Sequence, residues 1–205
     1  DGDPPKGELV INDDVIKETM RTDHVGFAET FAFTQWLGLD IYSLSPQYTS
    51  AAGRLPEASE CIWPHMKKWS LDTPLFIFAV LDGAFEWGMR LFGLEDFFSM
   101  LRSRAALQDL IKEVQKRNLY QLDKLADQGA NGIILADDIA YQQGLFARPH
   151  VFRELFIPSL ARLAERADVL GLPVFYHSDG NYTPVLNDIV RSGVAGLQCL
   201  EKTAG

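Results

Sequence analysis

A short run of the chain, PVFYHSDGN at residues 173–181, ends a strand-like segment with polar and turn-forming residues. Val174 to Tyr176 have the character of a buried β-strand, whereas His177 and Asp179 are costly to bury unless they have partners. The run therefore predicts a strand that carries an imidazole and a carboxylate to one end of a sheet. Such groups can hold a metal ion or exchange protons with a substrate.

Other acidic residues follow neighbouring strand-like segments and are expected at the same end of the sheet. Asp137 and Asp138 close one such segment, and Glu201 follows another. Side chains alternate along a strand, so only one of the two adjacent aspartates is expected to face the site. The predicted catalytic residues are His177, Asp179, Asp137, Asp138 and Glu201.

A histidine among carboxylates supports two kinds of chemistry. As metal ligands, one nitrogen and two or three carboxylate oxygens suit zinc or a harder divalent ion, with His177 and Glu201 as the expected ligands. Without a metal, clustered carboxylates raise one another's pKa, and an acid near neutrality can protonate a leaving group or a carbanion. The residues alone leave both uses open.

Residues in the neighbouring loops are candidates for binding a cofactor or substrate. Asp82 and Glu86 follow the third strand-like segment, where loops often carry function. Tyr141 and Tyr182 can stack on a flat ligand, and Asn181 ends the polar run. Each also has a simpler interpretation, as a capping acid, a packed ring or a turn residue.

The composition limits the classes of protein. The chain has 205 residues and a net charge of -9, with 28 acidic against 19 basic residues, which disfavours binding to nucleic acid or anionic membrane. Cys61 and Cys199 are far apart, so neither a disulfide framework nor a zinc ribbon is predicted, and Cys199 is expected in the core. With no long apolar run and no signal peptide, a cytoplasmic protein is expected.

Short apolar runs alternate with amphipathic segments, which is typical of a parallel α/β fold. The apolar runs are nearly continuous, as in strands that are covered on both faces. Neither a GxGxxG nor a P-loop sequence occurs, and the polar residues follow several different strands, so a single (β/α)8 barrel domain over residues 1–205 is favoured. The predicted strands are 7–11, 39–45, 74–80, 131–137, 173–177 and 195–200.

Two apolar stripes predict long helices between these strands. One stripe covers residues 104–128, and the other covers residues 152–167, where Pro158 is expected to cause a kink. Residues 46–73 are rich in proline, serine and alanine, and they are expected to form a long loop over one face.

The count of strands falls short of a complete barrel. A (β/α)8 barrel needs eight strands and roughly 250 residues, whereas the chain supplies six predicted strands. We therefore expect a barrel that is truncated after about six strands. Two open sheet edges would then favour association, and a homodimer is compatible with that expectation.

Four segments of the sequence together resemble the uroporphyrinogen decarboxylase superfamily. This superfamily joins tetrapyrrole decarboxylases to cobalamin- and corrinoid-dependent methyltransferases on a (β/α)8 barrel. The resemblance rests on the acidic pair DD, the later HSDGN and the final LExxAG, in that order and spacing. The segments are PPKGELVINDDVI (4–16), PLFIFAVLDGAFEWGMRLFGLEDFFSML (74–101), LADDIAYQQGLFARPHVFRELFIPSLARL (135–163) and GLPVFYHSDGNYTPVLNDIVRSGVAGLQCLEKTAG (171–205).

The departures from this family pattern distinguish its branches. The decarboxylases open with an arginine-rich segment that binds substrate carboxylates, and the chain has PKGELVI there. The methyltransferases hold zinc with an HxC pair after the fifth strand, and the chain has His177 with Asp179 at the cysteine position.

The resemblance therefore implies, first, transfer of a methyl group between a small methylated substrate and a corrinoid protein or cofactor, with zinc as the expected metal. Decarboxylation of a tetrapyrrole carboxylate is the alternative. A non-catalytic barrel that binds a small molecule is a third hypothesis, because one thiolate ligand is replaced.

Overall fold

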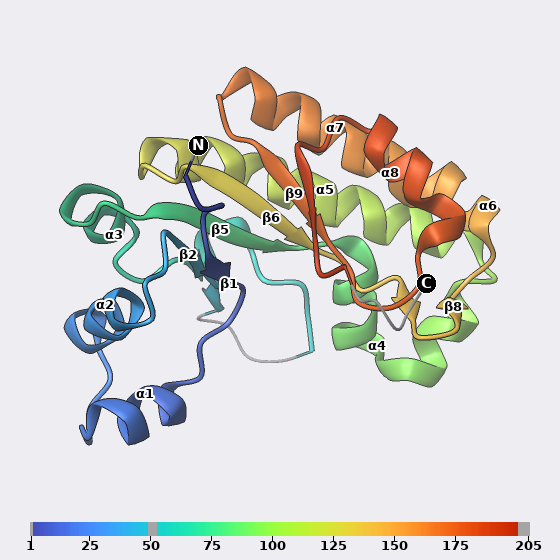
Figure 1. Cartoon of the computed structure of the whole chain (residues 1–205). Coiled ribbons are helices and arrows are strands. Elements are labelled where there is room, and N and C mark those ends of the chain that lie inside the picture. The colour runs from blue at the N-terminus through green and yellow to red at the C-terminus, as the bar shows by residue number, and fades with distance from the viewer. Residues whose placement is uncertain (1, 49–52, 201–205) are drawn as a thin grey trace.

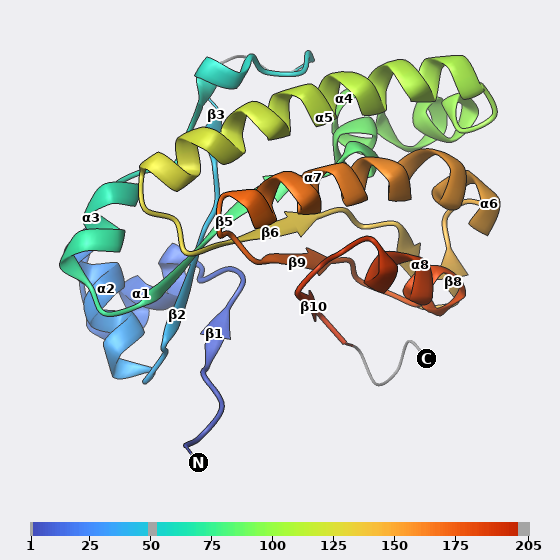
Figure 2. The ribbon, with the colours of Figure 1, turned by 90° about the horizontal axis from the view of Figure 1, so that it is seen from above.

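The computed structural model describes residues 2–48 and 53–200, and its centre is a curled six-stranded parallel sheet (Figures 1 and 2). Neighbouring strands are parallel, and their order across the sheet follows the chain. The strands are β1 (Gly7–Glu8), β2 (Ile41–Leu44), β5 (Phe76–Asp82), β6 (Gly132–Ala136), β9 (Val174–His177) and β10 (Gly196–Gln198). Each lies within or overlaps a predicted strand, so the barrel-type parallel architecture is confirmed.

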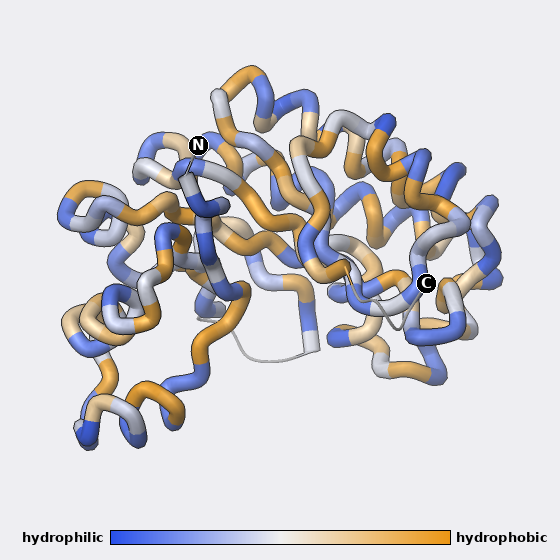
Figure 3. Tube along the Cα trace, in the orientation of Figure 1, coloured by the Kyte–Doolittle hydropathy of each residue, from blue (hydrophilic) through white to orange (hydrophobic). Residues whose placement is uncertain are grey.

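The central strands of the sheet are strongly hydrophobic (Figure 3). Both faces of the sheet carry buried apolar side chains, which explains the nearly continuous hydrophobic runs in the sequence. On one face, Ile77 and Ile133 belong to the large core that the helices complete. On the other face, Phe78, Val80 and Ile134 form a smaller cluster. Successive residues of one strand therefore belong to different environments, and this alternation continues into the residues that follow each strand.

Helices cover one face of the sheet, and α5 and α7 lie side by side over β6 and β9 (Figure 2). The stripe predicted over residues 104–128 forms α5, whose buried side chains include Leu107, Val114 and Leu125. Among the described residues, no helix combines the length and the apolarity that crossing a membrane requires. The longer helices are α1 (Asp13–Met20), α2 (Phe27–Trp36), α3 (Met66–Asp72), α4 (Ala84–Met100), α5 (Arg104–Asp127) and α7 (Ile157–Val169).

The kink expected at Pro158 takes the form of a π-helical turn. A short helix α6 (Pro149–Val151) leads into the π-turn η2 (Phe152–Phe156), and α7 continues from it. Pro158 has no N–H for the carbonyl four residues earlier, and its ring crowds that carbonyl. The wider turn before the proline accommodates both effects.

The expectation of a long loop over residues 46–73 is wrong. The segment contains an antiparallel pair, β3 (Gln47–Tyr48) with β4 (Cys61–Ile62), and the helix α3. Its elements are too short to give a periodic pattern, but they are anchored by a buried tryptophan. Trp69 stacks on Tyr42 with ring centroids 4.2 Å apart.

Short elements complete the carboxyl-terminal half. A hairpin of β7 (Ala140–Tyr141) and β8 (Gly144–Leu145) follows β6. The 3-10 turn η3 (Thr183–Val185) and the helix α8 (Leu186–Arg191) connect β9 to β10, and a similar turn η1 (Ala58–Glu60) precedes β4.

A sharp break at Gly93 divides α4 and brings Phe97 against Gly88. Gly93 adopts φ 72°, so the end of α4 folds back and the buried ring of Phe97 packs on Gly88. A Cβ at position 88 would lie 2.1 Å from Phe97 Cε2. Gly88→Ala is expected to lower the free energy of unfolding by about 1–3 kcal/mol through overpacking, measured by urea denaturation. Adding Phe97→Leu should recover part of the loss, and no recovery would refute this cause.

Candidate functional site

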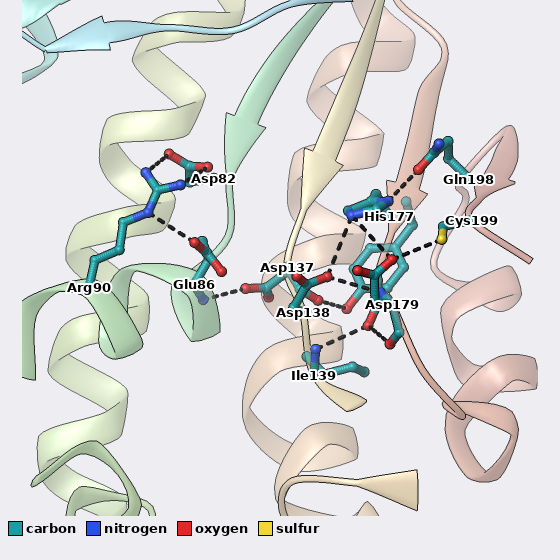
Figure 4. Close-up of polar contacts among 12 residues, drawn as sticks. Asp82, Glu86, Arg90, Asp137, Asp138, Ile139, His177, Asp179, Gln198 and Cys199 are labelled. Carbon is teal, nitrogen blue, oxygen red and sulfur yellow. Dashed lines mark hydrogen bonds and ion pairs between the residues drawn. The ribbon is translucent and has the colours of Figure 1, made fainter. Parts of the chain in front are cut away.

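Polar side chains gather at the carboxyl edge of the sheet, defined as the ends of β5, β6, β9 and β10 (Figure 4). Parallel strands end on the same edge, which is where barrel enzymes build their sites from the following loops. The last residue of β9 is His177, the residues directly after β6 are Asp137 and Asp138, and Cys199 directly follows β10.

His177 lies at the centre of one polar group. Its Nε2 atom is 3.5 Å from Asp138 Oδ1 and 4.0 Å from Asp179 Oδ1. The backbone N–H of Asp179 donates to Asp138 Oδ1 at 2.9 Å, and Cys199 Sγ donates to Asp179 Oδ1 at 2.8 Å. The structure thus brings together three of the predicted catalytic residues.

Asp137 and Asp138 point to opposite sides of the strand end, as the alternation of side chains predicts. Asp138 faces His177, whereas Asp137 Oδ1 accepts hydrogen bonds from the backbone N–H groups of Phe85 and Glu86 at 2.8 and 2.9 Å. These N–H groups belong to the first turn of α4, where a carboxylate is favoured by the helix dipole. Asp137 therefore ties α4 to β6.

Burial dominates the electrostatics of Asp137. It raises the pKa of this carboxyl to about 7, although the two N–H donors favour the charged form and so lower the pKa. The carboxyl group borders a cavity of about 30 Å³, together with Gln115, Asn118, Ser159 and Tyr176. Most of the lining is apolar, including Val114, Leu135 and Phe152, so the polar side chains form a small minority of the cavity wall.

A second polar group surrounds Asp82 at the end of β5. Arg90 donates to both carboxylate oxygens of Asp82, at 2.7 and 3.2 Å, and the Tyr48 hydroxyl donates to one of them. Arg90 Nε also donates to Glu86 Oε1 at 2.9 Å. Partial burial raises the pKa of Glu86, and the nearby Arg90 opposes that rise. A binding role for Asp82 stays a prediction.

The candidate binding residues of the following loops differ in accessibility. Tyr141 is 46% exposed, whereas Tyr182 is 5% exposed and its ring packs edge-on against Tyr176 in the core. Asn181 Oδ1 accepts from the N–H of Thr183 at 3.1 Å, which is an Asx turn. The roles predicted for Tyr141, Asn181 and Tyr182 stay predictions, and the ring of Tyr182 is buried in this arrangement.

Gly180 has a structural role in the loop that carries Asp179. Its φ of 78° lies in the left-handed region, and a Cβ there would lie 2.6 Å from backbone atoms of Tyr141. Glycine therefore allows the loop after β9 to approach the loop after β6 closely. The N–H of Asn181 donates to the Tyr141 carbonyl at 2.9 Å across this contact.

Cys199 was expected in the core, and this expectation is wrong. The residue is partly exposed, adopts φ 66°, and lies at the carboxyl edge beside Asp179. One donor atom from each of His177, Asp179 and Cys199 lies within 4.8 Å of the others. Glu201, the second predicted metal ligand, lies outside the described residues.

Sequence reasoning also missed Gln198, which contacts His177 from the neighbouring strand. The available signal was a polar residue inside a short strand, where an unpartnered amide is costly.

Comparison with known proteins identifies the family. A family model described as uroporphyrinogen decarboxylase (URO-D) matches residues 39–203. The chain belongs to this family. The match includes the carboxyl edge with His177, Asp179 and Cys199. No curated protein sequence matches this member of the uroporphyrinogen decarboxylase family significantly.

Solved structures support the fold of this family member. A methyltransferase from Methanosarcina mazei matches with a TM-score of 0.61 at 14% identity, over 82% of this chain and 59% of that chain. The TTHB071 protein from Thermus thermophilus, from a crystal soaked with ZnCl2, matches with a TM-score of 0.50 at 15% identity, over 83% and 60%. The chain thus spans about three fifths of the length of these two structures.

Proposed function

We propose that this member of the uroporphyrinogen decarboxylase family binds zinc through His177, Asp179 and Cys199. We further propose that it uses this site to transfer a methyl group between a small methylated compound and a corrinoid protein. The observation that supports this proposal most strongly is the convergence of one nitrogen, one oxygen and one sulfur donor on the ends of neighbouring strands.

The donors fit zinc in type and number. Zinc accepts imidazole nitrogen, carboxylate oxygen and thiolate sulfur, and catalytic sites use three protein ligands with one open position. Donor atoms around a tetrahedral zinc are roughly 3.3–3.7 Å apart. The three atoms present lie within 4.8 Å of one another, so small side-chain rotations would bring them to that spacing. Cys199 thus offers the thiolate that is lost where Asp179 replaces the family's cysteine.

Neighbouring residues hold these donors in place. Asp138 Oδ1 accepts a hydrogen bond from the backbone N–H of Asp179. This bond fixes the start of the loop that carries the Asp179 carboxylate. Gly180 lets the same loop rest on Tyr141. When bound, zinc would lower the pKa of a coordinated thiol or water and polarise a substrate oxygen. The Asp138 and Asp179 side chains are 41% and 56% exposed, so a substrate can approach them from solvent.

Two features favour methyl transfer over decarboxylation. A tetrapyrrole decarboxylase has to bind several substrate carboxylates, which requires cationic groups. Arg90 is at the carboxyl edge, but Asp82 and Glu86 already occupy three of its N–H donors. The buried acid with a pKa of about 7, Asp137, faces α4 rather than His177. The acid with the raised pKa is therefore directed away from the His177 group.

Metal analysis combined with a methyl-transfer assay tests the proposal. We expect about one zinc per chain after purification without chelator, as for a three-ligand site. We also expect zinc-dependent methylation of a reduced corrinoid by at least one compound in a panel of O-, N- and S-methyl donors. Protein that binds no zinc would contradict the metal assignment. Metal-free protein that decarboxylates a porphyrinogen would support the alternative activity, and protein with neither property would support a binding module.

A further inference from the structure

Gln198 contacts Nδ1 of His177, whereas Asp138 and Asp179 lie near Nε2 of the same ring. The two residues are directly paired in register across β9 and β10, so their side chains lie on the same face of the sheet. Gln198 Oε1 and His177 Nδ1 form a hydrogen bond (Figure 4). An amide oxygen can only accept, so Nδ1 is the donor in this arrangement.

The contacts of the two ring nitrogens are unequal. On the opposite side of the ring, Nε2 lies 3.5 Å from Asp138 and 4.0 Å from Asp179, and both distances are too long for a good hydrogen bond. A neutral imidazole carries one proton, and it retains that proton where the better acceptor lies. The hydrogen bond to Gln198 therefore favours the tautomer with the proton on Nδ1. The lone pair of Nε2 then faces Asp138 and Asp179.

We infer that Gln198 is a positioning residue that keeps the proton of His177 on Nδ1 and so presents Nε2 as a ligand atom. Partners of this kind set the orientation and tautomer of metal-binding histidines in general. The burial of the ring strengthens the argument, since the His177 side chain is 10% exposed and water replaces a lost partner poorly. The consequence for metal binding rests on the proposed zinc site, whereas the tautomer itself does not.

Nitrogen NMR of the metal-free protein tests the tautomer directly. At about pH 9, above the usual pKa range of histidine, we expect the native imidazole to carry its proton on Nδ1. Gln198→Glu should retain this tautomer, because a carboxylate only accepts hydrogen bonds. Gln198→Leu has a similar size without an acceptor, and it should move the proton toward Nε2. An unchanged tautomer in the leucine variant, or a native proton on Nε2, would overturn the inference.

Binding of Co²⁺ alone provides the second measurement. Gln198→Leu is expected to weaken Co²⁺ binding about 10–100-fold, and Gln198→Glu is expected to restore it. Circular dichroism and thermal unfolding of each variant establish that it is folded. If native protein shows the Nδ1 tautomer but binds no Co²⁺, the zinc site fails and the assignment of Gln198 to the tautomer stands. Equal Co²⁺ binding by native protein and the leucine variant would overturn the positioning role while leaving the zinc site intact.

Discussion

Replacing Cys199 with serine is expected to weaken zinc binding by at least about 100-fold, since changes to residues that merely support metal ligands already cost about 10–100-fold. The variant removes the sulfur donor and leaves His177 and Asp179. Thiolate is the donor in this group that most favours zinc over harder cations such as Mg²⁺. The loss should therefore be larger for zinc than for Mn²⁺, which accepts carboxylate and water ligands readily.

Competition with a chromophoric chelator gives the zinc affinity, and Co²⁺ provides a spectroscopic check. Native protein should show a sulfur-to-cobalt charge-transfer band, and Cys199→Ser should lack it. Cys61→Ser is the matched control, because Cys61 is the other cysteine of the chain. It is buried beside Arg117, and its sulfur accepts a hydrogen bond from the guanidinium. The Cys61→Ser variant should retain both the band and the affinity. A band that persists in Cys199→Ser, or disappears in Cys61→Ser, would exclude Cys199 as the ligand.

Replacing Asp137 with asparagine is expected to change how stability depends on pH. The pKa of Asp137 is about 7 in the folded protein and about 3.9 in an unfolded chain. Between these values the folded state binds more protons than the unfolded state. The contribution of Asp137 to the free energy of unfolding is therefore full below about pH 4 and is lost as the pH rises to about 7. The difference of about 3 pKa units corresponds to about 4 kcal/mol at most. Asparagine retains an oxygen for the N–H groups of Phe85 and Glu86 but does not titrate.

Urea denaturation at several pH values between about 4 and 8 measures this effect against the native protein. The stability of Asp137→Asn relative to native protein should increase over that range, because only the native carboxyl loses its bound proton. Asp109→Asn, at an exposed position of α5, is the control and should leave the slope unchanged. A stability difference that is constant with pH would show that Asp137 is already ionised in the folded protein at low pH.

Much of the fold follows from the sequence because its strands have a strong local signal. Segments such as 131–137 are apolar on both faces, and such runs fit poorly anywhere except between two packed layers. The alternation of side chains also predicted that Asp137 and Asp138 would separate, since it depends only on strand geometry. The fold class and the separation of the two aspartates were therefore accessible from local patterns.

The residues that make up the site were harder to predict from the sequence, because their meeting depends on the register between strands. Nothing in the residue types of Gln198 and Cys199 says that β10 pairs with β9 so that Gln198 lies beside His177. Cysteine behaves as a small hydrophobic residue in most cores, and that tendency led to the wrong expectation for Cys199. Residues 46–73 were misjudged for a different reason. Trp69 stabilises α3 through tertiary stacking on Tyr42, and no local propensity reports that contact.

The opposite orientations of Asp137 and Asp138 limit the insertions and deletions that β6 can accept. Deleting one residue within β6 would shift the alternation and direct each aspartate to the other face. Ile139 would then take the place of Asp138 beside His177, and Asp138 would take the place of Asp137 beside Phe85 and Glu86. A change of length in the exposed turn at residues 142–143 would leave both faces in place. Insertions and deletions should thus be tolerated better in that turn than within β6.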